Sequence, residues 1–514
     1  MGGSLEECVH IAGINKFFSL AEMLDYDTVF LGPAVDSEKL VDKIIEEKPD
    51  IVALSYRLTP ENASKHFVKL KKRIQDKGLQ DITYLFGGTS PVVEEAEKSG
   101  IFKKCFTGEE GENGVISYLQ GEAKGSEKRY SQHILERIDF SRPFPVLRAH
   151  FGQPTIKETV EGVQKIAEAE ALDVISLGTD QDTQANFFHP ERQSPDRKGA
   201  GGVPVRTRED FERIYKASRR GNLPLLRVYA GTDDMIQLAQ LYVDTINNAW
   251  AAIPIFWFNK MDGRGPHDLR SSIKMHLDTI KWHADADIPV EILESHHWSM
   301  RDAPDNIAVA SAVLGAYVSK ELGVNNFIQQ YMFNTPVNTS FTNDLAKMLA
   351  KKEMIQDLED EDFKVYHQSR AGLVSFPASV DGGYGQLASS TMLQMQLNPD
   401  IVHIVNYCEA HHAATADDVI TSSELVKQVI KNHLRGTPDM TINKDVQERK
   451  DQLKAQATRI LEGIYEVQLK GRIDADNLYQ IISEGIFDAP QLKNNPYALG
   501  EIKSVCRDGG YYES

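Results

Sequence analysis

Ile51-Val52-Ala53-Leu54-Ser55, continued by Tyr56-Arg57-Leu58-Thr59-Pro60-Glu61, decides the fold of the first part of the chain. The apolar run has the length of a buried strand. Thr59 and Pro60 then form a typical helix start, with a hydroxyl at the N-cap and proline at the first helical position. A strand followed at once by a helix is the unit of a parallel sheet that carries helices on its faces.

The same unit repeats on both sides of this stretch. Apolar runs predict further strands at 9–13, 28–32 and 83–88, and helix starts follow Asp36 and lie at Ser90-Pro91. Residues 1–122 are therefore predicted to form a small doubly wound α/β domain. Ligands of such domains bind beyond the carboxyl ends of the strands. The candidate binding residues at those ends are Gly13, Asn15, Ser55, Leu58, Gly87, Gly88, Thr107 and Gly108.

A polar, glycine-containing stretch at 121–129 predicts a linker, which we place at residues 123–142. Residues 143–514 then contain eight candidate buried strands, each followed by a segment of helix length, which is the number that a closed (β/α)8 TIM barrel needs. The strands are expected at 145–150, 172–177, 224–229, 253–258, 289–293, 326–331, 373–376 and 401–405. The remaining residues form a C-terminal extension.

Composition narrows the class of partner. The net charge of −18 argues against nucleic acid and anionic membranes, which favour basic surfaces. The 4 cysteines are scattered without a Cys-x-x-Cys pair, as expected of free thiols in a reducing compartment. Neither a leader peptide nor a long apolar span is visible in the sequence. We expect a cytoplasmic protein with a small-molecule partner.

Polar residues collect at the carboxyl ends of the predicted barrel strands. Cations there suit an anion such as a carboxylate, and in the alternative interpretation they pair with Asp180, Asp233 and Asp262. The candidate anion-binding residues are Arg148, His150, Arg206, Arg227, Lys260 and Arg264. Glu294 and Asp262 are candidate general acids or bases.

Two histidine pairs, His296-His297 and His411-His412, raise the question of a metal. Adjacent residues at a strand end point in opposite directions, so one pair does not ordinarily supply two ligands to one ion. A site from Glu294, His296 and His411 is the remaining alternative, and we predict no metal site in the barrel. The loop at 199–202 lacks the Gly-Lys-Ser/Thr ending of a P-loop and is expected to cover or contact a ligand through its backbone.

The first domain resembles a cobalamin-binding domain. Ser55 and Leu58 are similar to that family's Ser-x-Leu segment, and Gly87-Gly88 to its glycine pair. Thr107-Gly108 resembles its phosphate-side turn. The family's Asp-x-His-x-x-Gly, whose histidine ligates cobalt, should follow the first strand. The segment after the predicted strand 9–13 contains no histidine, and His10 is predicted to pack in the core. We therefore expect either cobalamin without protein histidine ligation or loss of the cofactor.

The barrel resembles the large catalytic subunit of cobalamin-dependent glutamate mutase. The segments 144–154, 199–204, 259–266 and 488–510 carry the similarity. The resemblance implies an adenosylcobalamin-dependent isomerase that rearranges the carbon skeleton of a small carboxylic or amino acid. It also implies a homodimer, with the cofactor held between the two domains.

Residue roles follow from the same resemblance. Arg148 corresponds to one carboxylate-binding arginine, while Lys260 stands at the place of another, with Arg264 displaced into its role. Gly201 and Gly202 correspond to a cofactor-facing glycine loop. Two other interpretations stay open at this stage, a corrinoid carrier or methyl-transfer protein and a barrel enzyme that has lost cobalamin.

Overall fold

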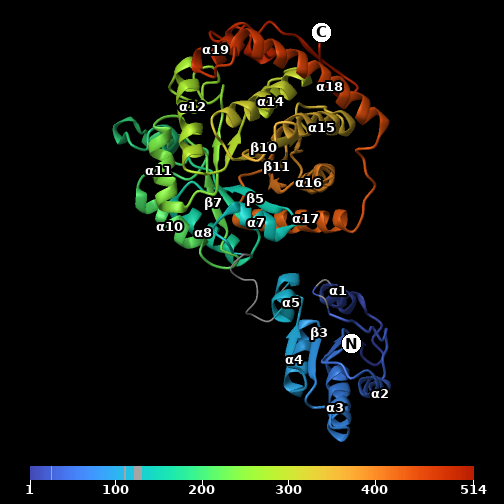
Figure 1. Ribbon diagram of the computed structural model, residues 1–514. Coiled ribbons are helices and arrows are strands. Elements are labelled where there is room, and N and C mark those ends of the chain that lie inside the picture. Colours follow the sequence, from blue (N-terminus) through green and yellow to red (C-terminus); the bar gives the residue numbers. More distant parts are fainter. Residues whose placement is uncertain (23, 25, 109–110, 121–129) are drawn as a thin grey trace. The chain divides into compact units, whose positions relative to one another are not determined.

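The computed structural model describes residues 1–22, 24, 26–108, 111–120 and 130–514. The chain divides into two compact units, Met1–Ser126 and Glu127–Ser514 (Figure 1). Both are α/β, as predicted. Among the described residues, no helix combines the length and the apolar character that crossing a membrane requires.

The first unit is a four-stranded parallel sheet in the order β1-β2-β3-β4. Alternate residues of β2 face opposite layers: Val52 and Leu54 pack in the core shared with α2–α4, and Ala53 packs with Ile14 and Phe18 of α1. The doubly wound fold is thereby confirmed. Its elements are β1 (Gly2–Ser4), α1 (Ala12–Glu22), α2 (Ser37–Glu47), β2 (Ile51–Tyr56), α3 (Pro60–Asp76), β3 (Thr83–Gly88), α4 (Ser90–Ser99), β4 (Lys104–Phe106) and α5 (Gly111–Gln120).

The first strand lies earlier than predicted. It is β1, whereas α1 begins at Ala12, so the prediction of a strand at 9–13 is wrong. The predicted strand at 28–32 contributes only a bridge from Phe30 to Gly2. A Cβ atom at Gly2 would lie 1.7 Å from the Ala53 oxygen, so only glycine fits there. Such a strand has no apolar side chains to reveal it in the sequence.

Eight parallel strands of the second unit form a TIM barrel in the order β7-β6-β5-β12-β11-β10-β9-β8, which confirms the predicted class. Two hydrogen bonds link β7 to β8 and bring the sheet nearly to closure: Ala249 N–H to Leu226 O (2.9 Å) and Ala230 N–H to Ala252 O (3.4 Å). The strands are β5 (Val146–Phe151), β6 (Val174–Leu177), β7 (Leu225–Val228), β8 (Ala251–Ile253), β9 (Val290–Ile292), β10 (Asn326–Phe333), β11 (Lys364–Ala371) and β12 (Ile401–Ile404).

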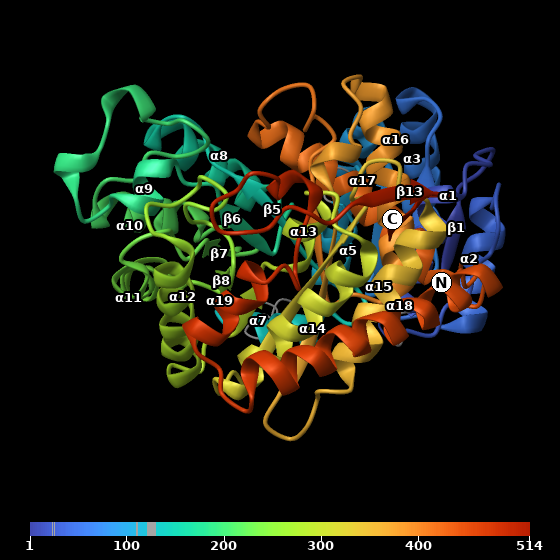
Figure 2. The ribbon, with the colours of Figure 1, turned by 90° about the horizontal axis from the view of Figure 1, so that it is seen from above.

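Helices surround these strands (Figure 1). They are α7 (Ile134–Ser141), α8 (Ile156–Glu168), α9 (Gln181–Ala185), α10 (Arg208–Ser218), α11 (Met235–Ile246), α12 (Leu269–Asp285), α13 (Ser295–Ser299), α14 (Asp305–Glu321), α15 (Phe341–Gln356), α16 (Val380–Gln394) and α17 (Ala416–Leu434). The C-terminal extension adds α18 (Lys444–Gly463), α19 (Ala475–Ser483) and a hairpin of β13 (Ser504–Arg507) and β14 (Gly510–Glu513). In Figures 1 and 2, α18 runs along the outside of α14 and α15.

Two barrel strands differ from prediction. The seventh is β11 rather than 373–376, since Leu373–Ser375 is a short 3-10 turn with exposed Leu373 and Val374 side chains. The inward-facing side chains of β11 are polar, so the strand does not appear as an apolar run. The fourth, β8, ends before Pro254, because the amides of Ile255 and Phe256 donate to the Glu294 carboxylate rather than to a neighbouring strand.

Part of the predicted linker is structured. Residues 121–129 lie outside the described residues, but α7 forms within the predicted range 123–142. Arg137 of α7 is buried and donates to the carbonyl oxygens of Ser131 (2.7 Å) and Leu223 (2.5 Å). Because these contacts join the helix to the segment before β7, α7 belongs to the barrel unit.

Candidate functional sites

A pocket of about 360 Å³ opens at the carboxyl end of the first unit's sheet. Its walls come from His10, from α1, from the ends of β2, β3 and β4, and from Val115 of α5. The predicted ligand residues that line it are Gly13, Ser55, Gly87, Gly88, Thr107 and Gly108. Asn15 and Leu58 do not line it, whereas Arg57 does and was missed by the sequence analysis.

His10 also lines this pocket and is exposed, which corrects its prediction as a core residue. Because the first strand ends at Ser4, the segment Cys8-Val9-His10-Ile11-Ala12-Gly13 follows it and runs into the start of α1. This segment has the His-x-x-Gly spacing expected after the first strand, with Cys8 where the family pattern has aspartate. The Cys8 sulfur lies 3.9 Å from His10 Nδ1. A histidine with this spacing therefore precedes residue 13 and lines the pocket.

The glycine pair at the end of β3 gives the pocket an open wall. A Cβ atom at Gly87 would meet nothing closer than the Phe106 oxygen at 4.0 Å. One at Gly88 would lie 2.8 Å from the Tyr56 oxygen and 2.9 Å from the Phe86 ring. Gly88 is thus required by the packing of the sheet itself, while Gly87 leaves space that a bound molecule can use.

The barrel centre is organised around the carboxylate of Glu291, which is fully buried. It accepts hydrogen bonds from Arg227 (2.8 Å) and Arg148 (3.4 Å), and also from Trp250 Nε1 (2.7 Å) and Gln368 Nε2 (3.0 Å). Burial opposes ionisation of Glu291, but the two guanidinium charges and the hydrogen bonds together outweigh burial and lower the pKa of this carboxyl. One carboxylate therefore holds two arginines.

Arg148 and Arg227, predicted as substrate anchors, lie inside the barrel and are fully buried. Burial lowers the pKa of Arg148 to about 9. A 3.1 Å hydrogen bond joins His150 Nε2 and the hydroxyl of Tyr229. Burial lowers the pKa of His150 well below its usual value, so the imidazole ring is neutral. These side chains make the interior of the barrel polar at this level.

The remaining predicted cations lie elsewhere. Arg264 is partly exposed and bonds Asp262 through Nε (2.7 Å), and Arg206 pairs with Asp180 (2.6 Å), as the alternative interpretation proposed for such arginines. Lys260 is exposed. Gly201 and Gly202 belong to the barrel unit, after β6.

Arg370 is a cation of the barrel interior that the sequence analysis missed, because β11 was placed too late. It is only 6% exposed, and its Nε donates to the Ala371 oxygen at 3.1 Å. Over the part of the chain that the structure describes, no carboxylate lies within ion-pair distance of it. Burial lowers the pKa of Arg370. A buried cation without a close counterion is costly, so Arg370 is a candidate for binding an anion.

The two candidate acid–base residues differ in environment. Burial raises the pKa of Glu294 to about 7, against the opposing hydrogen bonds from the Phe256 and Ile255 amides. This carboxyl can therefore lose or gain a proton near neutral pH. The Asp262 side chain instead accepts from the Phe258 (3.1 Å) and Asn259 (3.0 Å) amides and fixes the turn after β8. Its hydrogen bonds are structural.

Residues 1–115 match the family model of the B12 binding domain. The first unit is a cobalamin-binding domain. No curated protein gives a significant match to the chain. Among solved structures, a thiamine phosphate pyrophosphorylase from Pyrococcus furiosus is 10% identical, with 56% of this chain and 96% of that chain covered and a TM-score of 0.28. An N-acetylneuraminate lyase from Mycoplasma synoviae is 10% identical, with 62% and 98% covered and a TM-score of 0.27.

Proposed function

We propose that this protein is an adenosylcobalamin-dependent isomerase that rearranges the carbon skeleton of a small carboxylic or amino acid. The observation that carries the proposal is the B12-binding match over residues 1–115, together with the pocket that the same residues form. The polar barrel interior supports a catalytic role over a pure carrier role. Arg148 and Arg227 pair with Glu291, but the buried Arg370 lies outside this group of ion pairs, as a substrate-binding cation would.

The pocket residues fit the cofactor. Gly87 leaves an approach to the sheet end open, and Ser55 and Thr107 offer hydroxyls beside it. His10 offers an exposed imidazole that would ligate cobalt, and Cys8 would help to orient it. When bound, adenosylcobalamin supplies a carbon radical that can remove a hydrogen atom from a substrate.

Arg370 would bind the substrate carboxylate. Arg148, Arg227 and Arg370 bring three positive charges into the barrel interior, and Glu291 is within ion-pair distance of the first two. A carboxylate ligand would supply the missing negative charge at Arg370, where a charge-assisted hydrogen bond contributes about 1.5–3 kcal/mol. Glu294, with its raised pKa, is our candidate for holding a proton during turnover.

Turnover of labelled acids tests this proposal. Full-length protein loaded with adenosylcobalamin is mixed with carbon-13-labelled small carboxylic and amino acids, and products are followed by nuclear magnetic resonance. We expect a rearranged acid that requires the cofactor, and a KM at least tenfold higher for Arg370→Lys, which keeps the charge but loses the planar fork. Demethylation of methylcobalamin without rearrangement would instead identify a methyl-transfer protein. Absence of any corrinoid binding would indicate a barrel enzyme that has lost the cofactor.

Ligation of cobalt by His10 has its own spectroscopic test. Paramagnetic resonance of the cobalt(II) corrinoid bound to nitrogen-15-labelled protein should show splitting by one protein nitrogen. The splitting should vanish in His10→Ala and persist in His66→Ala, which changes another histidine of the same unit. A spectrum without protein-derived splitting in the unmodified chain would mean that His10 does not reach cobalt.

A further inference from the structure

The turn after β12 brings two adjacent histidines together. The Nδ1 atoms of His411 and His412 lie 2.8 Å apart. The argument that neighbouring residues point in opposite directions holds for a strand, but β12 ends at Ile404 and these residues lie in a turn. Both side chains therefore lie on one side of the turn, where a hydrogen bond joins their Nδ1 atoms.

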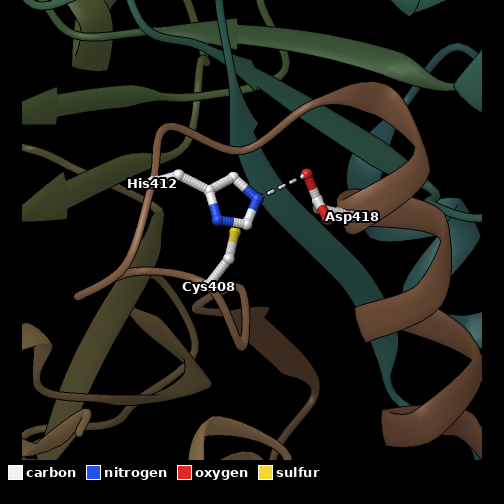
Figure 3. Close-up of side chains that lie close together, drawn as sticks. All are labelled: Cys408, His412 and Asp418. Atoms are coloured by element: carbon white, nitrogen blue, oxygen red, sulfur yellow. Dashed lines mark hydrogen bonds and ion pairs between the residues drawn. The ribbon is translucent and has the colours of Figure 1, made fainter. Parts of the chain in front are cut away.

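Asp418 fixes the orientation of His412. Its carboxylate lies 3.2 Å from His412 Nε2, on the opposite side of the ring from the other nitrogen (Figure 3). Asp418 is itself held by the amide (2.9 Å) and hydroxyl (2.6 Å) of Thr415 and by the hydroxyl of Tyr407. A histidine whose Nε2 donates to a carboxylate presents Nδ1 as an unprotonated ligand, an arrangement common around protein-bound metals.

Cys408 completes the group from the start of the same turn. Its side chain is fully buried, and its sulfur lies within 4.8 Å of a His412 ring nitrogen and of an Asp418 oxygen. Figure 3 shows this sulfur at the lower edge of the His412 ring, whereas the dashed line to Asp418 leaves from another ring atom. Sulfur and imidazole nitrogen are the ligands that zinc prefers.

We propose that Cys408 Sγ and His412 Nδ1 bind a zinc-type divalent cation, with Asp418 holding His412 in place. His411 becomes the third ligand when its proton moves from Nδ1 to Nε2 and its exposed side chain turns toward the metal. On binding, the Cys408 thiol releases its proton to solvent and the sulfur–metal bond forms, while the histidines bind as neutral rings. Without a metal, burial raises the pKa of the Cys408 thiol to about 11, and it stays protonated.

Three protein ligands leave a fourth tetrahedral position for water or a small ligand. The site lies beyond the carboxyl end of β12, at the end of the barrel where enzymes of this fold carry their chemistry. It shares no residue with the proposed cobalamin pocket or with the proposed substrate groups Arg370 and Glu294.

Zinc binding to corrinoid-free, full-length protein tests the site. Titration against a chromophoric chelator should give one zinc per chain, and metal analysis should confirm this ratio. Cys408→Ser and His411→Asn should abolish stoichiometric binding, and Asp418→Asn should weaken it by about 10–100-fold. Cys506→Ser is the matched control, because Cys506 is exposed and far along the chain from the turn.

Folding is checked separately by thermal unfolding of each variant. His411 is exposed, so His411→Asn should leave the melting temperature of the metal-free protein unchanged. The proposal is overturned if the unmodified protein takes up no stoichiometric zinc, or if Cys408→Ser and His411→Asn bind zinc as Cys506→Ser does.

Discussion

Glu291→Gln is expected to lower the free energy of unfolding of the barrel by about 3–5 kcal/mol. The amide keeps the size of the side chain and part of its hydrogen bonding but removes the carboxylate that pairs with both Arg148 and Arg227. Both guanidiniums would then remain fully buried without a counterion. Removing one partner of a buried ion pair costs far more than the pair itself contributes.

Tryptophan fluorescence in denaturant measures the free energy of unfolding of the barrel unit. All four tryptophans, Trp250, Trp257, Trp282 and Trp298, lie in that unit. Glu161→Gln on α8 is the matched control, since its side chain is 64% exposed, and it should change stability by less than about 0.5 kcal/mol. A loss below about 1 kcal/mol for Glu291→Gln would show that the arginines are compensated by other groups.

Gly87→Val should weaken cobalamin binding by at least about 100-fold, which corresponds to roughly 2.7 kcal/mol, without lowering the melting temperature of the first unit. The new side chain would meet little protein, because the nearest atom to a Cβ at this position is 4.0 Å away. It would instead occupy the open wall of the pocket. Equilibrium dialysis against adenosylcobalamin measures the affinity.

Gly88→Val gives a useful contrast. Its Cβ would press against the Tyr56 oxygen at 2.8 Å, so this variant should destabilise the sheet and lose binding only as a consequence. Gly385→Val, at an open position in the barrel unit, controls for the substitution itself. Wild-type affinity in a folded Gly87→Val protein would mean that the cofactor does not use this wall.

Much of the fold was predictable from local pattern. The runs at 51–55, 83–88 and 401–405 form strands, and helix α3 begins at Pro60 after Thr59, as predicted. These predictions are confirmed because an apolar strand pattern and a helix start each depend only on residues adjacent in sequence. The pattern failed at β1 and β11, where close backbone approach requires glycine and where the barrel interior is polar.

The candidate sites likewise combine features that local sequence predicts with features that depend on the tertiary structure. The sequence by itself determined the two α/β units and the glycines and hydroxyls at the ends of their strands, since alternating apolar runs and helix caps are local properties. Only the tertiary structure decided that His10 lines the pocket and that Arg148, Arg227 and Glu291 share one buried site. Arg148 and Glu291 are 143 residues apart, and closure of the barrel is what places them in contact.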